Sequence, residues 1–249
     1  MKNIWKSNDL YQYLLVERNK KPKFNVITGI PKLDSYLKGG FMPGDLVVIS
    51  GKTGHGKTTF AITLTQAFCE SGLNLLWFSY EVNALDFLEK TKDSYDDIPG
   101  FFMPFQLVPN SLEFIEKSIQ NAIKEWGGVE VIIIDHLHYL CDMANVHMSI
   151  EIGRVMRWLK QLAIRYGICV FIICHLQKLF QIKLKELDND HLRDSSFVAQ
   201  EADAVFFIIR PDETENEGLL KITKERRNGT RNKYIELVKI GNYFKEKAK

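Results

Sequence analysis

The sequence predicts an α/β domain built on a mostly parallel, twisted sheet that helices flank on both sides. Continuous apolar runs alternate with helical patterns through most of the 249 residues. Strands that are covered on both faces have this continuous apolar character, which is typical of a parallel sheet between helices. The last part of the chain differs, because two short runs surround Asn228-Gly229 and predict a hairpin at one edge of the sheet.

Six apolar runs are expected to form the strands of the main sheet. They cover residues 46–49, 73–78, 105–108, 129–134, 168–174 and 204–209. Helical patterns are expected between them, at about residues 57–71, 84–93, 111–125 and 150–166. The two hairpin strands are expected at residues 219–223 and 234–238.

Residues 1–24 are predicted to form a short helix and a basic linker, ahead of one large domain over residues 25–249. The segment Lys20-Lys21-Pro22-Lys23 breaks the apolar periodicity that surrounds Leu10 and Leu14. This helix either packs on a neighbouring subunit or frays, and the sequence favours neither alternative. Turn signals in residues 25–44 surround a further short helix at residues 31–37.

Composition limits the function classes. The 33 lysines and arginines nearly balance the 31 acidic residues, so any contact with nucleic acid must come from a local patch. The 4 cysteines lack the spacing of a metal site and are expected to be reduced and mostly buried. No apolar run approaches the length of a membrane span, and the N-terminus lacks a secretory signal pattern, so no membrane association is expected.

The octet from Gly51 to Thr58, GKTGHGKT, fits the phosphate-loop pattern G-x-x-x-x-G-K-[ST] between an apolar run and a helical pattern. Glycines let the backbone wrap around phosphate oxygens, and N–H groups at the helix start supply positive potential. Lys57 is expected to reach the β- and γ-phosphates, and Thr58 to bind Mg²⁺. The predicted ligand is ATP with Mg²⁺. The residues expected to bind it are Gly51, Thr53, Gly54, His55, Gly56, Lys57, Thr58 and Thr59.

Three polar residues follow apolar runs and are expected at the carboxyl edge of the sheet. Asp135 can hold Mg²⁺ beside Thr58. Glu81 can deprotonate the attacking water, and its alternative is a solvated strand-end glutamate. His175 can hydrogen-bond the γ-phosphate and report its loss, although a single histidine is more often structural.

Two basic segments could also have a functional role. The segment after His175 contains Lys178, Lys183, Lys185 and Arg193. It suits a loop that grips the phosphates of single-stranded DNA, and it fits a solvated surface loop equally well. In the hairpin turn, Arg226 or Arg227 can stabilise transition-state charge in a neighbour's site, but surface arginines usually have no such role.

The ordered motifs resemble the RecA-like motor domain of the DnaB-family replicative helicases, in the Twinkle and phage primase–helicase branch. The resemblance spans about residues 26–238. Its motifs are the lead-in TGIPKLD with GGFMPGD, then SYE at residues 79–81, DHLH at 135–138, CHLQK at 174–178, LRDSS with EAD at 192–203, and KER at 224–226. Many members carry Tyr and Gln where this chain has His136 and His138. A histidine at position 175 is typical of the Twinkle and phage branch.

The resemblance implies an ATP-driven DNA helicase motor that moves on single-stranded DNA as a homo-oligomeric ring, a hexamer, during replication. Lys57, Glu81 and His175 would act in one subunit, and Arg226 would come from its neighbour. The expected location is cytoplasmic or phage-encoded intracellular, with an organelle as an open alternative. Only about two dozen residues precede the motor, so priming is not expected. The rivals are a non-unwinding RecA/KaiC-like ATPase in recombination or regulation, and an assembly module that binds nucleotide without hydrolysing it.

Overall fold

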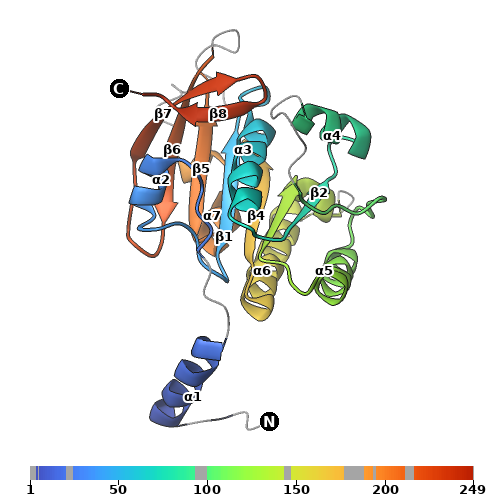
Figure 1. Ribbon diagram of the computed structural model, residues 1–249, viewed down its shortest axis with the longest axis vertical. Helices are drawn as coiled ribbons and strands as arrows, with labels where there is room; N and C mark the ends of the chain where they lie inside the picture. Colours follow the sequence, from blue (N-terminus) through green and yellow to red (C-terminus); the bar gives the residue numbers. More distant parts are fainter. Residues whose placement is uncertain are drawn as a thin grey trace.

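The computed structural model describes residues 4, 6–20, 25–92, 100–142, 147–176, 188–192, 195–210 and 216–248. A sheet in the order β2-β3-β4-β1-β5-β6-β7-β8 forms its middle layer (Figure 1). The strands are β1 Leu46–Gly51, β2 Leu75–Ser79, β3 Val131–Asp135, β4 Cys169–His175, β5 Ala204–Ile209, β6 Glu217–Glu225, β7 Lys233–Ile240 and β8 Tyr243–Glu246. The α-helices are α1 Ser7–Lys20, α2 Pro31–Tyr36, α3 Lys57–Glu70, α4 Ala84–Lys92, α5 Leu112–Trp126, α6 Met148–Tyr166 and α7 Ser195–Glu201, and short 3-10 turns are η1 Leu137–Leu140 and η3 Asn189–His191.

The sheet has a parallel part and an antiparallel part. The strands β2, β3, β4, β1 and β5 run parallel, and β6, β7 and β8 continue the sheet in antiparallel pairs. Because parallel strands need crossover connections, helices cover the faces of this part. All five parallel strands therefore end at one carboxyl edge, where the chain passes into the loops that carry the expected site.

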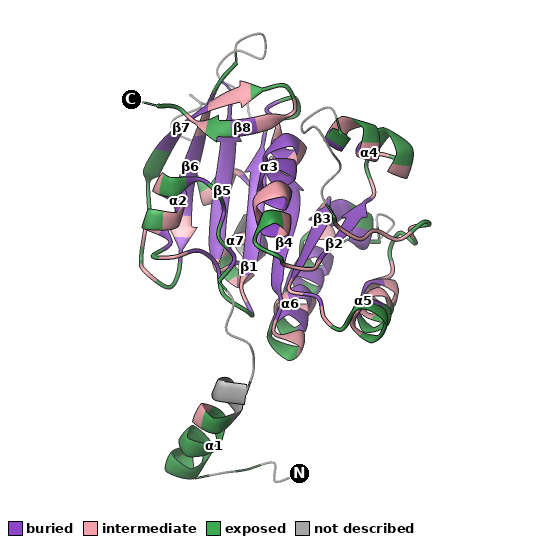
Figure 2. Cartoon of the chain, in the orientation of Figure 1, coloured by how far each residue is buried: buried purple, intermediate pink, exposed green. Residues whose placement is uncertain are grey.

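Each face of the sheet has its own apolar core. In β1, Leu46 and Val48 pack with residues of α5 and α6 on one face, while Val47 and Ile49 pack with residues of α2 and α3 on the other. The parallel strands are consequently buried along their length (Figure 2). This two-sided burial explains the continuous apolar runs, so the predicted fold class is confirmed.

The strand predicted at residues 105–108 is wrong. Phe105 is 92% exposed and Val108 is 46% exposed, so this apolar run is not covered on both faces. Prolines stand on either side of the run and provide no backbone donors for a ladder. The edge of β2 is met instead by Phe102, whose backbone bonds to Leu75 and Trp77 at 2.8 Å and whose ring stacks on Trp126.

The predicted hairpin exists as β6 and β7, but it is not the edge of the sheet. The edge strand is β8, which pairs with β7 and was not predicted. Phe244 of β8 is fully buried, and its backbone N–H donates to Thr63 Oγ1 on α3 at 2.8 Å. The end of the chain is therefore attached to the helix that follows the phosphate loop.

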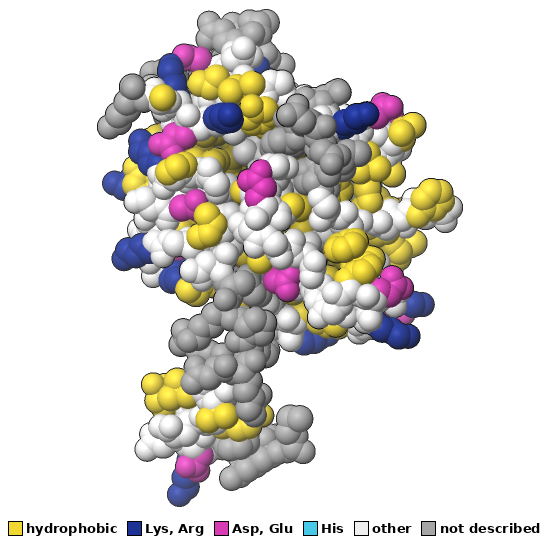
Figure 3. Space-filling view, viewed as in Figure 1, with side chains coloured by type: hydrophobic (Ala, Val, Ile, Leu, Met, Phe, Trp, Pro, Cys, Tyr) yellow, Lys and Arg dark blue, Asp and Glu magenta, His cyan; other side chains and the backbone are white. Residues whose placement is uncertain are grey.

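Helix α1 lies apart from the sheet in Figure 1. Most of its apolar side chains are exposed, and they form a visible patch in the lower part of Figure 3. These side chains are Leu10, Tyr11, Tyr13, Leu14 and Val16. Among the helices of the described residues, none combines the length and the apolar character needed to cross a bilayer.

Candidate nucleotide-binding and catalytic site

Residues 51–58 form a tight turn from the end of β1 into α3. Gly56 is the N-cap of α3 in the left-handed conformation, with φ 89°. Gly51 has φ 158°, and a Cβ atom there would stand 2.5 Å from the carbonyl oxygen of Ile208. The turn therefore requires glycine at these positions, and it directs the backbone N–H groups at the start of α3 towards the carboxyl edge.

Lys57 begins α3 and its side chain curls back over the loop. Its Nζ donates to the carbonyl oxygen of Lys52 at 3.1 Å. Burial lowers the pKa of the Lys57 ammonium, and the nearby carboxylates of Asp135 and Glu81 oppose that shift. The loop thus holds one cationic group directly above the turn, where it can meet an anionic ligand.

Thr58 and Asp135 form a pair beneath the loop. Thr58 Oγ1 donates to Asp135 Oδ2 at 2.7 Å. Burial raises the pKa of the Asp135 carboxyl to about 6, and the hydrogen bond from Thr58 opposes that shift. No group among the described residues bonds to the buried Asp135 Oδ1. A hydroxyl and a carboxylate with remaining acceptor capacity fit the oxygen ligands that Mg²⁺ requires.

A cavity of about 290 Å³ opens above this pair and gathers most of the expected residues. Its walls include Thr53, Gly54, Gly56, Lys57, Thr58, Thr59, Glu81 and His175. Two of the residues expected to bind ATP do not line it, and neither does the buried Asp135. Gly51 shapes the turn, and the ring of buried His55 faces Arg210, whose backbone N–H donates to His55 Nδ1 at 3.3 Å.

Three cavity residues carried no signal in the sequence. Lys90 comes from α4, Lys239 from the end of β7, and Asn242 from the turn before β8. Asn242 Nδ2 donates to the carbonyl oxygen of Lys90 at 3.3 Å, which joins the two walls. The two lysines add positive charge to a cavity that Lys57 already makes cationic, which suits a polyphosphate.

The basic segment after His175 cannot be located, because Lys178, Lys183, Lys185 and Arg193 lie outside the described residues. Its two ends are described. Leu176 and Leu192 form an antiparallel bridge, so the chain leaves the carboxyl edge and returns to it at one point. The described ends of the segment therefore lie side by side next to His175.

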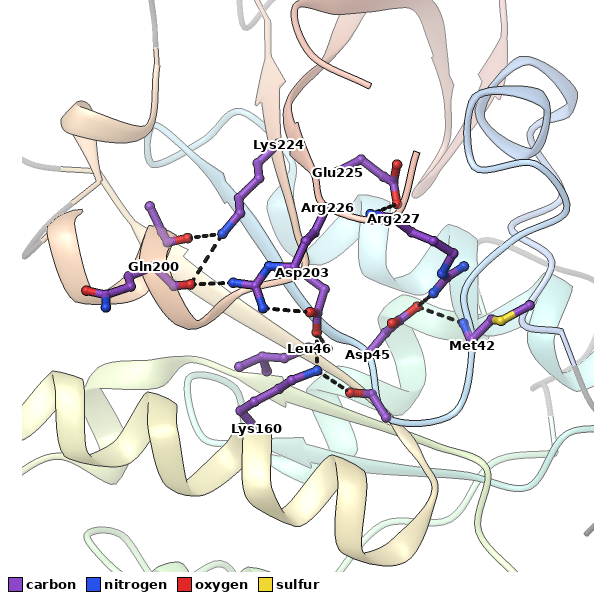
Figure 4. Close-up of polar contacts among 12 residues, drawn as sticks. Met42, Asp45, Leu46, Lys160, Gln200, Asp203, Lys224, Glu225, Arg226 and Arg227 are labelled. Carbon is purple, nitrogen blue, oxygen red and sulfur yellow. Dashed lines mark hydrogen bonds and ion pairs between the residues drawn. The ribbon is translucent and has the colours of Figure 1, made fainter. Parts of the chain in front are cut away.

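The two candidate finger arginines lie at the opposite, amino edge of the sheet (Figure 4). Arg226 Nη2 donates to the carbonyl oxygen of Gln200 at 2.7 Å, and Nη1 lies 3.3 Å from Asp203 Oδ1. Arg227 pairs with Asp45 and donates to the carbonyl oxygen of Gly40. The side chain of Arg226 is 51% exposed and that of Arg227 is 35% exposed, so Arg226 is the more accessible.

Neither arginine can reach the phosphate loop of its own chain. Glu225 is in register with Ala204 at the start of β5, whereas the loop begins at the end of β1. A strand of this length separates the two edges by roughly 20 Å. The structure therefore does not bring Arg226 together with Lys57 and Glu81 within one subunit.

Comparison with protein-family models identifies the family of this chain. Residues 107–245 match the model described as the DnaB-like helicase C-terminal domain, which is more than half of the chain. The chain belongs to this family. Residues 26–101 match the KaiC ATPase model, so the lead-in and the phosphate loop resemble a related group of ATPases.

Curated relatives of this DnaB-like chain are longer proteins. The replicative DNA helicase DnaB of Haemophilus influenzae is 29% identical over 245 residues, which cover 82% of this chain and 51% of the relative. A probable replicative DNA helicase of Trieres chinensis is 24% identical over 272 residues, covering 91% of this chain and 59% of the relative. The chain thus spans about half the length of the curated relatives it matches.

Solved structures agree on the fold. The ATPase domain of G40P superimposes with a TM-score of 0.79 at 19% identity and covers 100% of both chains. A KaiC-like protein of Pyrococcus horikoshii reaches a TM-score of 0.67 at 18% identity, covering 91% of this chain and 100% of that protein. These likenesses confirm the RecA-like architecture of the DnaB-like domain.

Proposed function

We propose that this DnaB-like chain is an ATP-hydrolysing motor that moves along single-stranded DNA as a ring and unwinds duplex DNA during replication. One observation carries the proposal. A single cavity at the carboxyl edge is bordered by Lys57, Thr58, Glu81 and His175, the groups needed to bind and hydrolyse a nucleoside triphosphate. The relatives named as replicative DNA helicases supply the cellular context.

Within this proposal, each group has one task. The loop N–H groups and Lys57 bind the β- and γ-phosphates of ATP. Thr58 and Asp135 would hold Mg²⁺, which would supply neutralising charge for the phosphates. Glu81 accepts a proton from the attacking water, and His175 donates a hydrogen bond to the γ-phosphate. Lys90 and Lys239 add positive potential around the polyphosphate.

The remaining catalytic charge comes from a second subunit. Arg226 lies at the amino edge, roughly one strand length or ~20 Å from the phosphate loop of its own chain. A finger that cannot act within its own chain requires a neighbour whose carboxyl edge faces it. A closed ring satisfies this requirement for every subunit, and we propose a hexamer.

Coupling to DNA would pass through the loop that starts after His175. Because Leu176 and Leu192 close the base of that loop, a change at the His175 ring would act directly on its anchor. Lys178, Lys183, Lys185 and Arg193 are proposed to bind the phosphates of single-stranded DNA. Loss of the γ-phosphate would then shift the loop along the strand.

The test is a single-turnover ATPase assay with and without single-stranded DNA, combined with strand displacement from a forked duplex. We expect DNA to stimulate hydrolysis and ATP to drive displacement. Glu81→Gln should lower the hydrolysis rate about 10²–10⁴-fold and leave nucleotide binding intact. Glu113→Gln, an exposed glutamate on α5, is the matched control. A Glu81→Gln protein that hydrolyses ATP normally would refute the catalytic assignment.

A non-unwinding, KaiC-like ATPase is the second candidate. The KaiC model that matches residues 26–101 and the KaiC-like neighbour favour it. It predicts hydrolysis that is indifferent to DNA and no strand displacement in the same assay. Absence of hydrolysis altogether would instead indicate a nucleotide-binding assembly module.

A further inference from the structure

We propose that Glu81, His136 and His175 form a binding site for a divalent transition-metal ion, with Zn²⁺ as the expected occupant. This site lies beside the Thr58–Asp135 pair and uses different donor atoms. Its residues are one carboxylate and two imidazoles, a donor set found in zinc and non-haem iron proteins.

The geometry of the three side chains supports the site. One ligand atom of each residue lies within 4.8 Å of the others. The rings of His136 and His175 have their centroids 4.2 Å apart at 77°. A tetrahedral Zn²⁺ with bonds of about 2.0–2.1 Å places its donors about 3.3 Å apart. Binding therefore requires the exposed Glu81 side chain to rotate and the two rings to reorient until their donor atoms reach that spacing.

The fold explains why these residues meet. Glu81 follows β2, His136 follows β3, and His175 ends β4. These strands are neighbours in the sheet and run parallel, so their carboxyl ends lie side by side. The donors are thus fixed by three adjacent strand ends, and the ion needs little reorganisation of the backbone to bind.

Donor chemistry separates this ion from Mg²⁺. Imidazole nitrogens suit Zn²⁺, Cu²⁺, Ni²⁺ and Fe²⁺, whereas Mg²⁺ requires oxygen ligands in octahedral geometry. A millimolar Mg²⁺ background should therefore occupy the Thr58–Asp135 pair and leave the nitrogen donors available. His138 is buried nearby, with its ring centroid 6.2 Å from that of His175, and it does not belong to the donor set.

Binding of such an ion would inhibit the motor. The Glu81 carboxylate cannot accept a proton from water while it coordinates a metal, and a coordinated His175 cannot follow the γ-phosphate. This inhibitory effect rests on the proposed function of Glu81 and His175, whereas the metal site itself rests only on the geometry of its donors.

The first experiment titrates the full, nucleotide-free chain with Co²⁺ in Mg²⁺-containing buffer and records the visible absorption. We expect one Co²⁺ per chain with ligand-field bands, which Zn²⁺ displaces. His136→Tyr and Glu81→Gln should each weaken Co²⁺ binding at least ~100-fold. His147→Ala, an exposed histidine before α6, should bind Co²⁺ as the unchanged chain does. Glu81 is exposed, so Glu81→Gln tests the site even if His136→Tyr impairs folding.

The second experiment measures Mg²⁺-dependent ATP hydrolysis at increasing Zn²⁺. Inhibition at the Zn²⁺ concentration that displaces Co²⁺ supports both the site and the roles of Glu81 and His175. Binding without inhibition supports the site and overturns those catalytic roles. Failure to bind Co²⁺, or binding that both His136→Tyr and Glu81→Gln retain, overturns the site whatever the ATPase result.

Discussion

The two edges of the parallel sheet carry similar charged residues in opposite arrangements. At the carboxyl edge, Lys57, Glu81 and His175 border a cavity of about 290 Å³. At the amino edge, Asp203 accepts hydrogen bonds from Lys160 at 2.6 Å and from Arg226 at 3.3 Å (Figure 4). One edge therefore directs its polar groups towards a cavity, whereas at the other edge the charged groups pair with one another within the chain.

The difference comes from what holds each group in place. At the carboxyl edge, strand ends and a glycine turn position the polar groups through the backbone, around an open cavity. At the amino edge, the side chains hold each other, and Asp203 also accepts the backbone N–H of Leu46 at 2.8 Å. Paired, partly buried charges stabilise the fold, whereas a cavity of converging polar groups indicates a binding site.

The largest expected effect is the loss of ATP hydrolysis when Arg226, at the amino edge, is removed. If the amino edge completes the carboxyl edge of a neighbour, Arg226→Ala should lower the ATP hydrolysis rate about 10³–10⁵-fold. Arg157→Ala, an exposed arginine of α6 at the same end of the sheet, should leave the rate unchanged. Steady-state ATPase assays at a protein concentration that supports oligomers provide the measurement.

A mixing experiment tests whether Arg226 acts between subunits. Arg226→Ala subunits retain Glu81, and Glu81→Gln subunits retain Arg226. Mixed rings therefore contain some interfaces with both groups intact, and the mixture should recover hydrolysis that neither variant shows alone. No recovery in verified mixed oligomers would contradict a finger supplied by the neighbour, and a loss caused by Arg227→Ala alone would transfer the role to Arg227.

The next largest effect is expected at the carboxyl edge, from removal of the Lys57 ammonium. Lys57→Ala should lower ATP hydrolysis about 10²–10³-fold, because it removes a charged donor from the transition state. Binding of a fluorescent ATP analogue should weaken as well. Lys117→Ala, an exposed lysine on α5, serves as the matched control. Normal hydrolysis by Lys57→Ala would show that the cavity is not the reaction site.

The sequence predicted the parallel sheet because burial on both faces leaves continuous apolar runs. It failed at residues 105–108, where apolar character alone does not reveal that Phe105 faces solvent. It also missed β8, since four residues with mixed polarity carry no clear period. Only the tertiary fold shows that Phe244 packs against α3, where a Cβ atom on Gly56 would stand 2.9 Å from its ring.

The site was predictable to the extent that its residues have local signals. Lys57 and Thr58 belong to a spaced motif, and Asp135, Glu81 and His175 follow apolar runs that had to end at one edge. Lys90, Lys239 and Asn242 have no such signal, because α4 and the β7–β8 turn approach the loop only through the fold. The His136–His175 contact likewise depends on strand order, which spacing along the chain does not determine.

The paired charges at the amino edge should contribute measurably to the free energy of unfolding. Asp203→Ala removes a carboxylate, 15% exposed, that bonds to Lys160 and to the backbone N–H of Leu46. We expect the free energy of unfolding to fall by about 1–3 kcal/mol. Arg157→Ala, which breaks an exposed pair with Glu201, should cost only about 0.2–1 kcal/mol. Urea unfolding of both variants gives the comparison, and equal losses would mean that the Asp203 contacts are no stronger than surface pairs.

The smallest expected effect is a difference in thiol reactivity between the two ends of β4, one at each edge of the sheet. Cys169 begins β4 at the amino edge and Cys174 lies near its carboxyl end; both are buried, and burial raises the pKa of each thiol.

Burial and the nearby Glu70 also raise the pKa of Cys69, to about 11, so only about one thiol in 10³ is ionised at pH 8. We therefore expect slow reaction of all 4 cysteines with a thiol reagent in the native chain and rapid reaction in denaturant. Faster labelling of Cys174 than of Cys169, suppressed by ATP, would show that the carboxyl edge opens while the amino edge stays closed. Equal, slow labelling would show that both edges are equally rigid and that only the cavity distinguishes them.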